Sequence, residues 1–174
     1  MSLAIGVWES PTRYLVASDR RITADNIACM RSPSRCKLVA LGGWHAAWAG
    51  ALPGVAALVD ALREPIDATR KSAEEMLAVA WRTSADLGGA PPAFEFRRSG
   101  VNLLLVGPAG LARMDSFGCI DWHDHVAAIG CAEEYALGYL DAAGTPWESA
   151  RRAILAAADR YVGVGDGVDV AGTL

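Results

Sequence analysis

Five short candidate strands precede the first helical pattern of this chain. They are residues 3–8, 14–18, 21–29, 37–41 and 44–49, of which residues 21–29 alternate loosely and the other four are apolar. Residues 9–12 carry turn chemistry, and Gly42-Gly43 is typical of a two-residue hairpin. Strands that follow one another through such short turns pair antiparallel. The first part of the chain therefore predicts antiparallel sheet rather than the alternating βαβ units of a parallel one.

The remainder of the chain predicts two helices, a second group of strands and two further helices. One helical stripe begins at Pro53 and covers residues 53–62; the next covers residues 72–85, where Ser72 and Glu75 have capping-box spacing. Strands are predicted at residues 93–96, 101–106, 111–115, 119–122 and 126–129, with a short last strand at 168–170. The closing helices are predicted at residues 133–142 and from Thr145-Pro146 to about Tyr161.

Strands and helices that are segregated in this way favour an α+β fold. We expect a four-layer αββα sandwich, in which two antiparallel sheets lie between helix pairs, because this arrangement buries every apolar stripe. The 174 residues suit one domain that spans residues 1–174, and no repeat of fixed period is visible.

Composition narrows the class of protein. Hydrophobic residues make up 52% of the chain and charged residues 21%, which is typical of a globular protein. The net charge is −4 without a basic block, so no nucleic acid partner is expected. The apolar runs are shorter than the ~20 residues of a membrane span, and no signal peptide is visible, so we expect a cytoplasmic protein without membrane contact. The four cysteines lack framework spacing and are interpreted as free thiols.

The start of the chain carries the most specific chemistry. Removal of Met1 would leave Ser2 with its hydroxyl and its α-amine on one residue, and an α-amine of pKa ~7.7–8.0 is a suitable base. None of the three histidines has the sequence context of a serine hydrolase base. Lys37 could lower the pKa of that amine and Asp19 could balance the lysine. Gly50, which ends a strand before a helix, could offer its N–H to an oxyanion.

Five segments in the same order resemble proteasome β-type subunits, which are N-terminal-nucleophile hydrolases. Residues 2–7 are similar to the mature start of these subunits, and Asp19-Arg20-Arg21-Ile22-Thr23 resembles their Asp-Arg-Arg-x-Thr segment. Lys37 stands where the family has its catalytic lysine. Ala49-Gly50 resembles the Ala-Gly before the first helix, and residues 126–131 resemble the segment before the third. The resemblance covers nearly the whole chain.

The resemblance implies peptide-bond hydrolysis by a threonine- or serine-type endopeptidase inside a self-compartmentalising, homo-oligomeric ring. Ser2 would attack the carbonyl, while Asp19 and Lys37 would set charge and orientation. Gly50 would bind the oxyanion, and Thr23 would align the substrate backbone. The substrate would be a peptide or unfolded protein, an ATP-dependent unfoldase would be a partner, and no organic cofactor is implied.

The chain also departs from the family pattern. The nucleophile is Ser2 rather than Thr, and Cys131 replaces a supporting serine. Arg21 pairs with Asp19 in the functional interpretation and belongs to a plain surface turn in the alternative. Asp159 or Asp166 could be the supporting acid, but no Ser or Thr follows nearby.

Other interpretations stay open at the level of sequence. The chain could be a catalytically silent ring or scaffold subunit, or an amidase that uses the same chemistry on a small linear amide. Lys37 could be a strand-edge lysine that deters aggregation, and Cys131 a small buried hydrophobe or a nucleophile. His123 and His125 alternate as zinc ligands would, but further ligands at standard spacing are missing, so no metal site is predicted.

Overall fold

The computed structural model describes residues 2–21, 23–24, 27–28, 37–50, 67–87, 101–165 and 167–173. It contains two large antiparallel sheets, one two-stranded sheet and three helices within these ranges. The first sheet has the order β10-β1-β2-β11, formed by Val126–Gly130, Leu3–Ser10, Arg13–Asp19 and Val168–Thr173. The second has the order β5-β6-β7-β8-β9, formed by Leu38–Leu41, Trp44–Gly50, Val101–Gly107, Gly110–Met114 and Ile120–His123.

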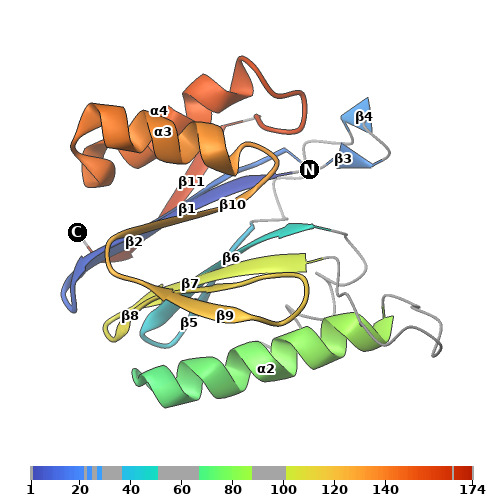
Figure 1. Cartoon of the computed structure of the whole chain (residues 1–174), viewed down its shortest axis with the longest axis vertical. Coiled ribbons are helices and arrows are strands. Elements are labelled where there is room, and N and C mark those ends of the chain that lie inside the picture. Colours follow the sequence, from blue (N-terminus) through green and yellow to red (C-terminus); the bar gives the residue numbers. More distant parts are fainter. Residues whose placement is uncertain are drawn as a thin grey trace.

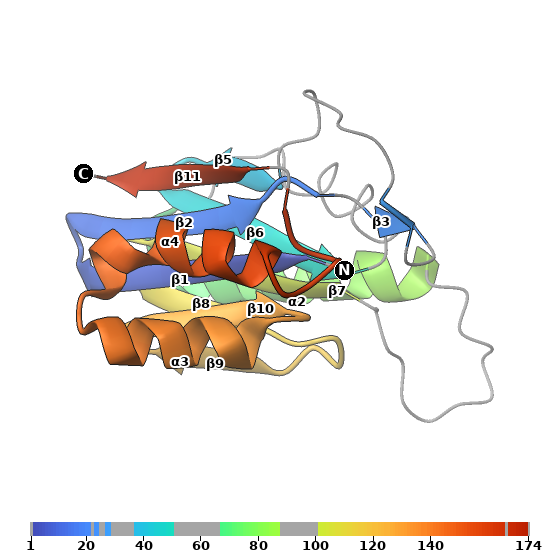
Figure 2. The same ribbon diagram turned by 90° about the horizontal axis from the view of Figure 1, so that it is seen from above.

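The layers follow the predicted αββα order (Figure 1). Helices α3 (Glu133–Ala143) and α4 (Pro146–Ala158) cover the outer face of the first sheet. Helix α2 (Arg70–Leu87) covers the outer face of the second. The view from above shows α3 and α4 side by side over β1, β2 and β10 (Figure 2). The predicted helix at residues 53–62 and the predicted strand at residues 93–96 lie outside the described residues.

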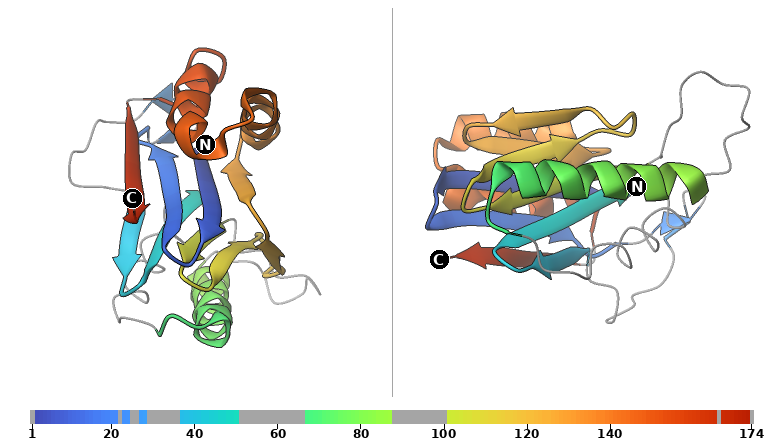
Figure 3. Two further views of the ribbon diagram at one scale, coloured as in Figure 1. Left: turned by 90° about the vertical axis from the view of Figure 1, so that its left-hand side faces the viewer. Right: turned by 90° about the horizontal axis from the view of Figure 1, so that it is seen from below.

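Three apolar layers hold the sandwich together. One lies under α2, one under α3 and α4, and the third lies between the sheets. The sheets approach closely at Gly6 of β1, where an added Cβ would be 2.5 Å from Leu111 Cδ1 of β8. Edge strands β11 and β5 lie on the same side of the molecule, so the two sheets end together there (Figure 3).

Most of the strand predictions are confirmed, including the hairpin at Gly42-Gly43, where Gly42 has a φ of 68°. The predicted single strand over residues 21–29 is wrong, because β3 (Thr23–Ala24) and β4 (Ile27–Ala28) pair antiparallel with each other. The last strand extends to Thr173, beyond the predicted end at residue 170, because its whole length pairs with β2.

Two helix boundaries also differ from the prediction. Helix α2 begins at Arg70, and the backbone N–H of Ser72 donates to Thr69 Oγ1 over 3.2 Å, so Thr69 rather than Ser72 caps this helix. Helix α4 ends at Ala158, three residues before the predicted end at Tyr161. Thr145 and Pro146 do open it as predicted.

Candidate active site

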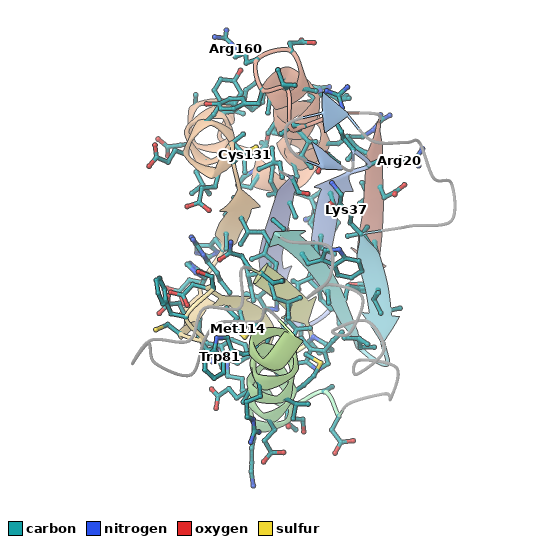
Figure 4. All side chains as sticks on the ribbon, turned by 90° about the vertical axis from the view of Figure 1, so that its right-hand side faces the viewer. Arg20, Lys37, Trp81, Met114, Cys131 and Arg160 are labelled. Carbon is teal, nitrogen blue, oxygen red and sulfur yellow. The ribbon has the colours of Figure 1, made fainter. Side chains whose placement is uncertain are left out.

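Four strand ends meet where the chain begins. Leu3 at the start of β1 pairs with Gly130 at the end of β10, and Asp19 at the end of β2 pairs with Val168 at the start of β11. Lys37 precedes β5 of the second sheet and reaches Asp19. Figure 4 views this end of the molecule and labels Lys37 together with Cys131, the residue after β10. Antiparallel pairing thus gathers residues that lie far apart in the sequence.

The centre of the site is the ion pair between Asp19 and Lys37. The Lys37 Nζ lies 2.8 Å from Asp19 Oδ1, and the two side chains are 6% and 0% exposed. Lys37 also donates to the backbone carbonyl of Arg21. A charged pair that is withdrawn from water in this way stabilises only when its remaining hydrogen-bonding capacity is filled. This contact is the one that the sequence predicts for the two residues.

Backbone donors fill the remaining capacity of the Asp19 carboxylate. Leu3 N–H donates to Oδ1 over 2.9 Å. Arg21 N–H and Gly165 N–H each donate to Oδ2 over 3.2 Å. The carboxylate therefore accepts four hydrogen bonds from four parts of the chain. Its orientation is fixed by the backbone as well as by the lysine.

Ser2 lies directly beside this pair, because it precedes the Leu3 amide that Asp19 binds. Ser2 is 8% exposed, and its carbonyl accepts a hydrogen bond from Cys131 N–H over 3.0 Å. Gly130 has a φ of 115°, and a Cβ on it would overlap the Ser2 carbonyl oxygen. Leu3 is fully buried, and burial of such a side chain is worth about 1.5–3 kcal/mol. Packing and hydrogen bonds therefore anchor the peptide group that joins Ser2 to Leu3.

Cys131 contributes its backbone to the site and keeps an exposed thiol. Partial desolvation raises the pKa of this thiol, and the negative charge of Asp19 adds to the rise. The thiol is therefore predominantly protonated at neutral pH, which disfavours the interpretation of Cys131 as the nucleophile. The exposure of Cys131 also contradicts its interpretation as a small buried hydrophobe.

The other predicted site residues lie at varying distances from this centre. Arg21 is half-buried, and its Nη1 donates to the Val162 carbonyl over 2.8 Å. Gly50 is the exposed last residue of β6, with a φ of 142°, and β6 ends on the side of the molecule where β1 begins (Figure 1). Thr23 belongs to β3, and its side chain lies outside the described part of the structure.

Asp159 is not part of the centre. It is exposed at the end of α4 and lines a hollow of about 430 Å³ together with Leu155, Gly165, Gly167 and Val168. The structure records no hydrogen bond between the described atoms of Asp159 and those of Ser2, Asp19 or Lys37. Asp166 lies outside the described residues.

Sequence reasoning missed two residues that contact the site. Gly165 acts through its backbone, and the only sequence signal is the glycine-rich stretch at residues 163–167. Ser18 is fully buried, and its Oγ lies 3.4 Å from the Leu3 carbonyl and 3.2 Å from the Asp19 carbonyl. Its place directly before Asp19 in an apolar strand is a weak signal that a buried hydroxyl has a local partner.

Two further features bear on the class of protein. Among the described residues, His, Cys, Asp and Glu side chains do not gather in any group of three or more that could hold a metal ion. Within the same part of the chain, none of the helices combines the length and the apolar character that a membrane crossing requires.

Comparison with known proteins gives matches in structure alone. No family profile matches the sequence, and no curated protein matches it. BPH from Thiobacillus denitrificans, solved in complex with epoxomicin, superposes with a TM-score of 0.77 at 20% identity over 99% of each chain. HslV from Trypanosoma brucei gives a TM-score of 0.67 at 20% identity over 97% of each chain. Anbu, an ancestral beta-subunit from Yersinia bercovieri, gives 0.72 at 16% identity over 97% of this chain and 79% of its own.

These similarities cover nearly the entire chain, and they join the element order and the two stacked antiparallel sheets as evidence for the fold. The chain therefore has the N-terminal-nucleophile hydrolase fold that it shares with bacterial proteasome-like proteins, HslV and Anbu, as the resemblance in sequence predicts.

Proposed function

We propose that the chain is a proteasome-like peptidase subunit that hydrolyses peptide bonds with Ser2 as its N-terminal nucleophile. The observation that carries this proposal is the buried Lys37–Asp19 pair, whose carboxylate also binds the backbone N–H of Leu3, the residue next to Ser2. A buried ion pair beside the start of β1 costs desolvation energy, so stability alone is a poor reason for its presence. It is well suited to keep charge and geometry constant around a reacting hydroxyl.

In the proposed reaction, removal of Met1 exposes the α-amine of Ser2. The Ser2 hydroxyl attacks the carbonyl carbon of the peptide bond, and its proton passes to the α-amine. The Gly50 N–H stabilises the oxyanion, and the protonated amine gives its proton to the departing amine of the substrate. Water then hydrolyses the ester on Ser2 by the same route in reverse. Lys37, with its charge balanced by Asp19, disfavours protonation of the α-amine before the attack.

The supporting roles follow the same assignment. Thr23 aligns the substrate backbone, Arg21 holds the chain after Asp19 in place, and Cys131 fixes the Ser2 carbonyl through its own N–H. Asp159 has the least support among the predicted residues, because it is exposed and none of its described atoms is bonded to those of Ser2, Asp19 or Lys37. No organic cofactor is required by this chemistry.

We further propose that the subunit works in a homo-oligomeric ring on peptides or unfolded proteins, with an ATP-dependent unfoldase as partner, in the cytoplasm. The fold shared with HslV and Anbu supports the ring, and the epoxomicin complex of BPH supplies a probe ligand. The silent scaffold subunit and the small-amide amidase are the alternatives that the experiments below separate.

The test begins with the intact mass of untagged protein, which is expected to lack Met1. Hydrolysis of an unstructured peptide is then measured for wild type, Lys37→Ala and Asp19→Asn. Both variants should lose at least about 100-fold in kcat, as when one preorganised polar group is removed from an active site. Lys71→Ala, an exposed lysine whose side chain is 86% exposed, is the matched control and should keep full activity.

The proposal fails if folded, assembled Lys37→Ala hydrolyses the peptide as fast as wild type. Retention of Met1 with no hydrolysis and no epoxomicin binding would identify the scaffold subunit instead. Hydrolysis of small linear amides by a protein that leaves peptides intact would identify the amidase.

A further inference from the structure

The segment before β11 is joined to the site through both backbone groups of one residue, Gly165. Its N–H donates to Asp19 Oδ2 over 3.2 Å. Its carbonyl accepts hydrogen bonds from Arg20 N–H over 3.1 Å and from Arg21 N–H over 3.0 Å. Gly165 therefore holds the end of β2 through both of its backbone groups, and it is itself buried.

A side chain at this position is excluded for two independent reasons. Gly165 has a φ of 150°, a backbone conformation that residues with a Cβ rarely adopt. An added Cβ would also lie only 2.8 Å from the guanidinium carbon of Arg21. The Arg21 side chain cannot easily give way, because its Nη1 is bound to the Val162 carbonyl three residues earlier in the same segment.

We propose that Gly165 is a positioning residue of the site, whose N–H fixes the rotation of the Asp19 carboxylate. This inference rests on the proposed function. Two donors reach each carboxylate oxygen: Lys37 Nζ and Leu3 N–H reach Oδ1, while Arg21 N–H and Gly165 N–H reach Oδ2. With Gly165 in place, turning the carboxylate would break bonds on both oxygens at once. Without it, Oδ2 keeps a single backbone donor, and the alignment of Oδ1 on Lys37 is weakened.

The position of Gly165 also shows how this chain supports its site where the expected side chains are missing. No Ser or Thr follows Asp159 or Asp166 nearby in the sequence, and Asp159 lies outside the centre. A backbone amide needs no side chain to reach the carboxylate. The glycine-rich segment at residues 163–167 allows the approach.

The kinetic test compares Gly165→Ala with Gly167→Ala. Gly167 is the matched control, because it also has a positive φ, of 102°. Its added Cβ would lie 3.4 Å from the flexible Arg20 Cδ. Among the described residues, its N–H has no recorded hydrogen bond to Asp19. Gly165→Ala should lower kcat by about 10- to 100-fold, as loss of an outer-sphere partner does at other sites, with KM changed less than about 3-fold. Gly167→Ala should keep kcat within about 3-fold of wild type. Equal losses in both variants would overturn the proposal.

A double-mutant comparison separates positioning from general damage. Combining Gly165→Ala with Asp19→Asn should lower kcat no further than Asp19→Asn alone, because both changes disable one unit. Losses that multiply would show that Gly165 acts independently of Asp19, and the proposal would be wrong.

A measurement without catalysis covers the cases in which Gly165→Ala does not fold or wild type hydrolyses no peptide. Amide hydrogen exchange of Gly165 is followed by NMR in wild type and in Asp19→Asn. The single acceptor oxygen of Asn is drawn to the Lys37 ammonium, so its NH2, which only donates, faces the Gly165 N–H. Protection of the Gly165 amide should fall at least about 10-fold relative to the amides of β7, which report global opening. Unchanged relative protection would overturn the inference. Inactive wild type that still shows this loss would reject the proposed function while retaining the contact.

Discussion

The Asp19 carboxylate is the residue on which the site depends most. It accepts bonds from Lys37, Leu3, Arg21 and Gly165, although only the lysine is visible as a partner in the sequence. Removing Lys37 leaves a buried carboxylate that keeps three backbone donors. Removing the carboxylate leaves a buried ammonium without its counter-charge and takes an acceptor from three backbone N–H groups, of which that of Arg21 keeps the Gly165 carbonyl as a second acceptor. This is the more costly defect.

We predict that Asp19→Leu destabilises the fold more than Lys37→Met does. Breaking a buried ion pair costs about 3–5 kcal/mol, and we place Lys37→Met near the lower figure and Asp19→Leu at or above the upper one. The free energies of unfolding are measured in urea on both variants. The assignment of Asp19 as the organiser of the four strand ends fails if Lys37→Met is the less stable protein.

His45 of β6 is a second residue whose properties should affect the stability of the fold. Its Nδ1 is buried, and no described atom accepts a hydrogen bond from it or donates one to it. Burial lowers the pKa of His45 below its ordinary value of 6.5. The unfolded chain therefore binds this proton at a higher pH than the folded protein does, so stability is lost as the pH falls below about 6.5.

We predict that His45→Gln reduces this acid-induced loss. The melting temperatures of wild type and His45→Gln are compared between pH 7.5 and pH 5.0, and the drop should be smaller in the variant. Parallel curves over that range would show that the imidazole of His45 does not titrate on unfolding.

At the scale of elements, Gly130 shows how closely β10 and the start of β1 approach. An added Cβ at Gly130 would overlap the Ser2 carbonyl oxygen, and its φ of 115° is itself unfavourable for other residues. Gly144 offers the matched comparison, since it has a φ of 67° at the end of α3 with no described atom within 4 Å of an added Cβ.

We predict that Gly130→Ala costs at least about 3 kcal/mol of stability, because backbone strain and displacement of Ser2 add together. Gly144→Ala should cost about 1 kcal/mol from the left-handed conformation alone. Both values come from urea unfolding. Equal costs would mean that β1 shifts freely at its start, contrary to the anchoring of Ser2 described above.

Helices and strands with a strong local sequence pattern could be predicted from the sequence. Contacts that the backbone makes in the folded protein could not. The Gly42-Gly43 hairpin and the Pro146 helix start have distinct local chemistry, and both occur. Residues 21–29 alternate in hydrophobicity, yet their described parts form two strands that pair with each other. The alternation favoured one strand over the turn residues Asp25-Asn26 that separate the two. Asp19 and Lys37 were predicted from charge pairing, whereas the Gly165 amide was missed because every residue except proline carries one.

At the scale of the whole molecule, apolar side chains remain exposed on several elements. Val79 on α2 is 45% exposed, and Leu155 on α4 is 43% exposed. Val79 lies within α2, the described counterpart of the helix predicted at residues 72–85. Exposed apolar positions on helices that flank a sandwich are suited to contacts between copies.

We predict that the protein assembles well above the 18.3 kDa of one chain at micromolar concentration. Light scattering coupled to size-exclusion chromatography should report a symmetric oligomer, and Val79→Glu should shift it toward smaller species. Lys71→Glu, a polar exchange at an exposed position of the same helix, should leave the oligomer intact. A clean monomer of wild type would contradict the ring.

The two ends of the chain differ in what they tolerate as attachment points. The first residues enter β1 between β2 and β10. The last strand, β11, runs parallel to β1 at the edge of the same sheet, so it ends at the end of the sheet opposite to the start of β1 (Figure 1). Under the proposed mechanism, a polypeptide fused ahead of Ser2 would block the α-amine, whereas one fused beyond β11 would follow the far end of the sheet. Purification tags and fluorescent reporters for testing that mechanism therefore belong after β11. Under the same mechanism, a library of amino-terminally tagged proteins would record this chain as an inactive peptidase.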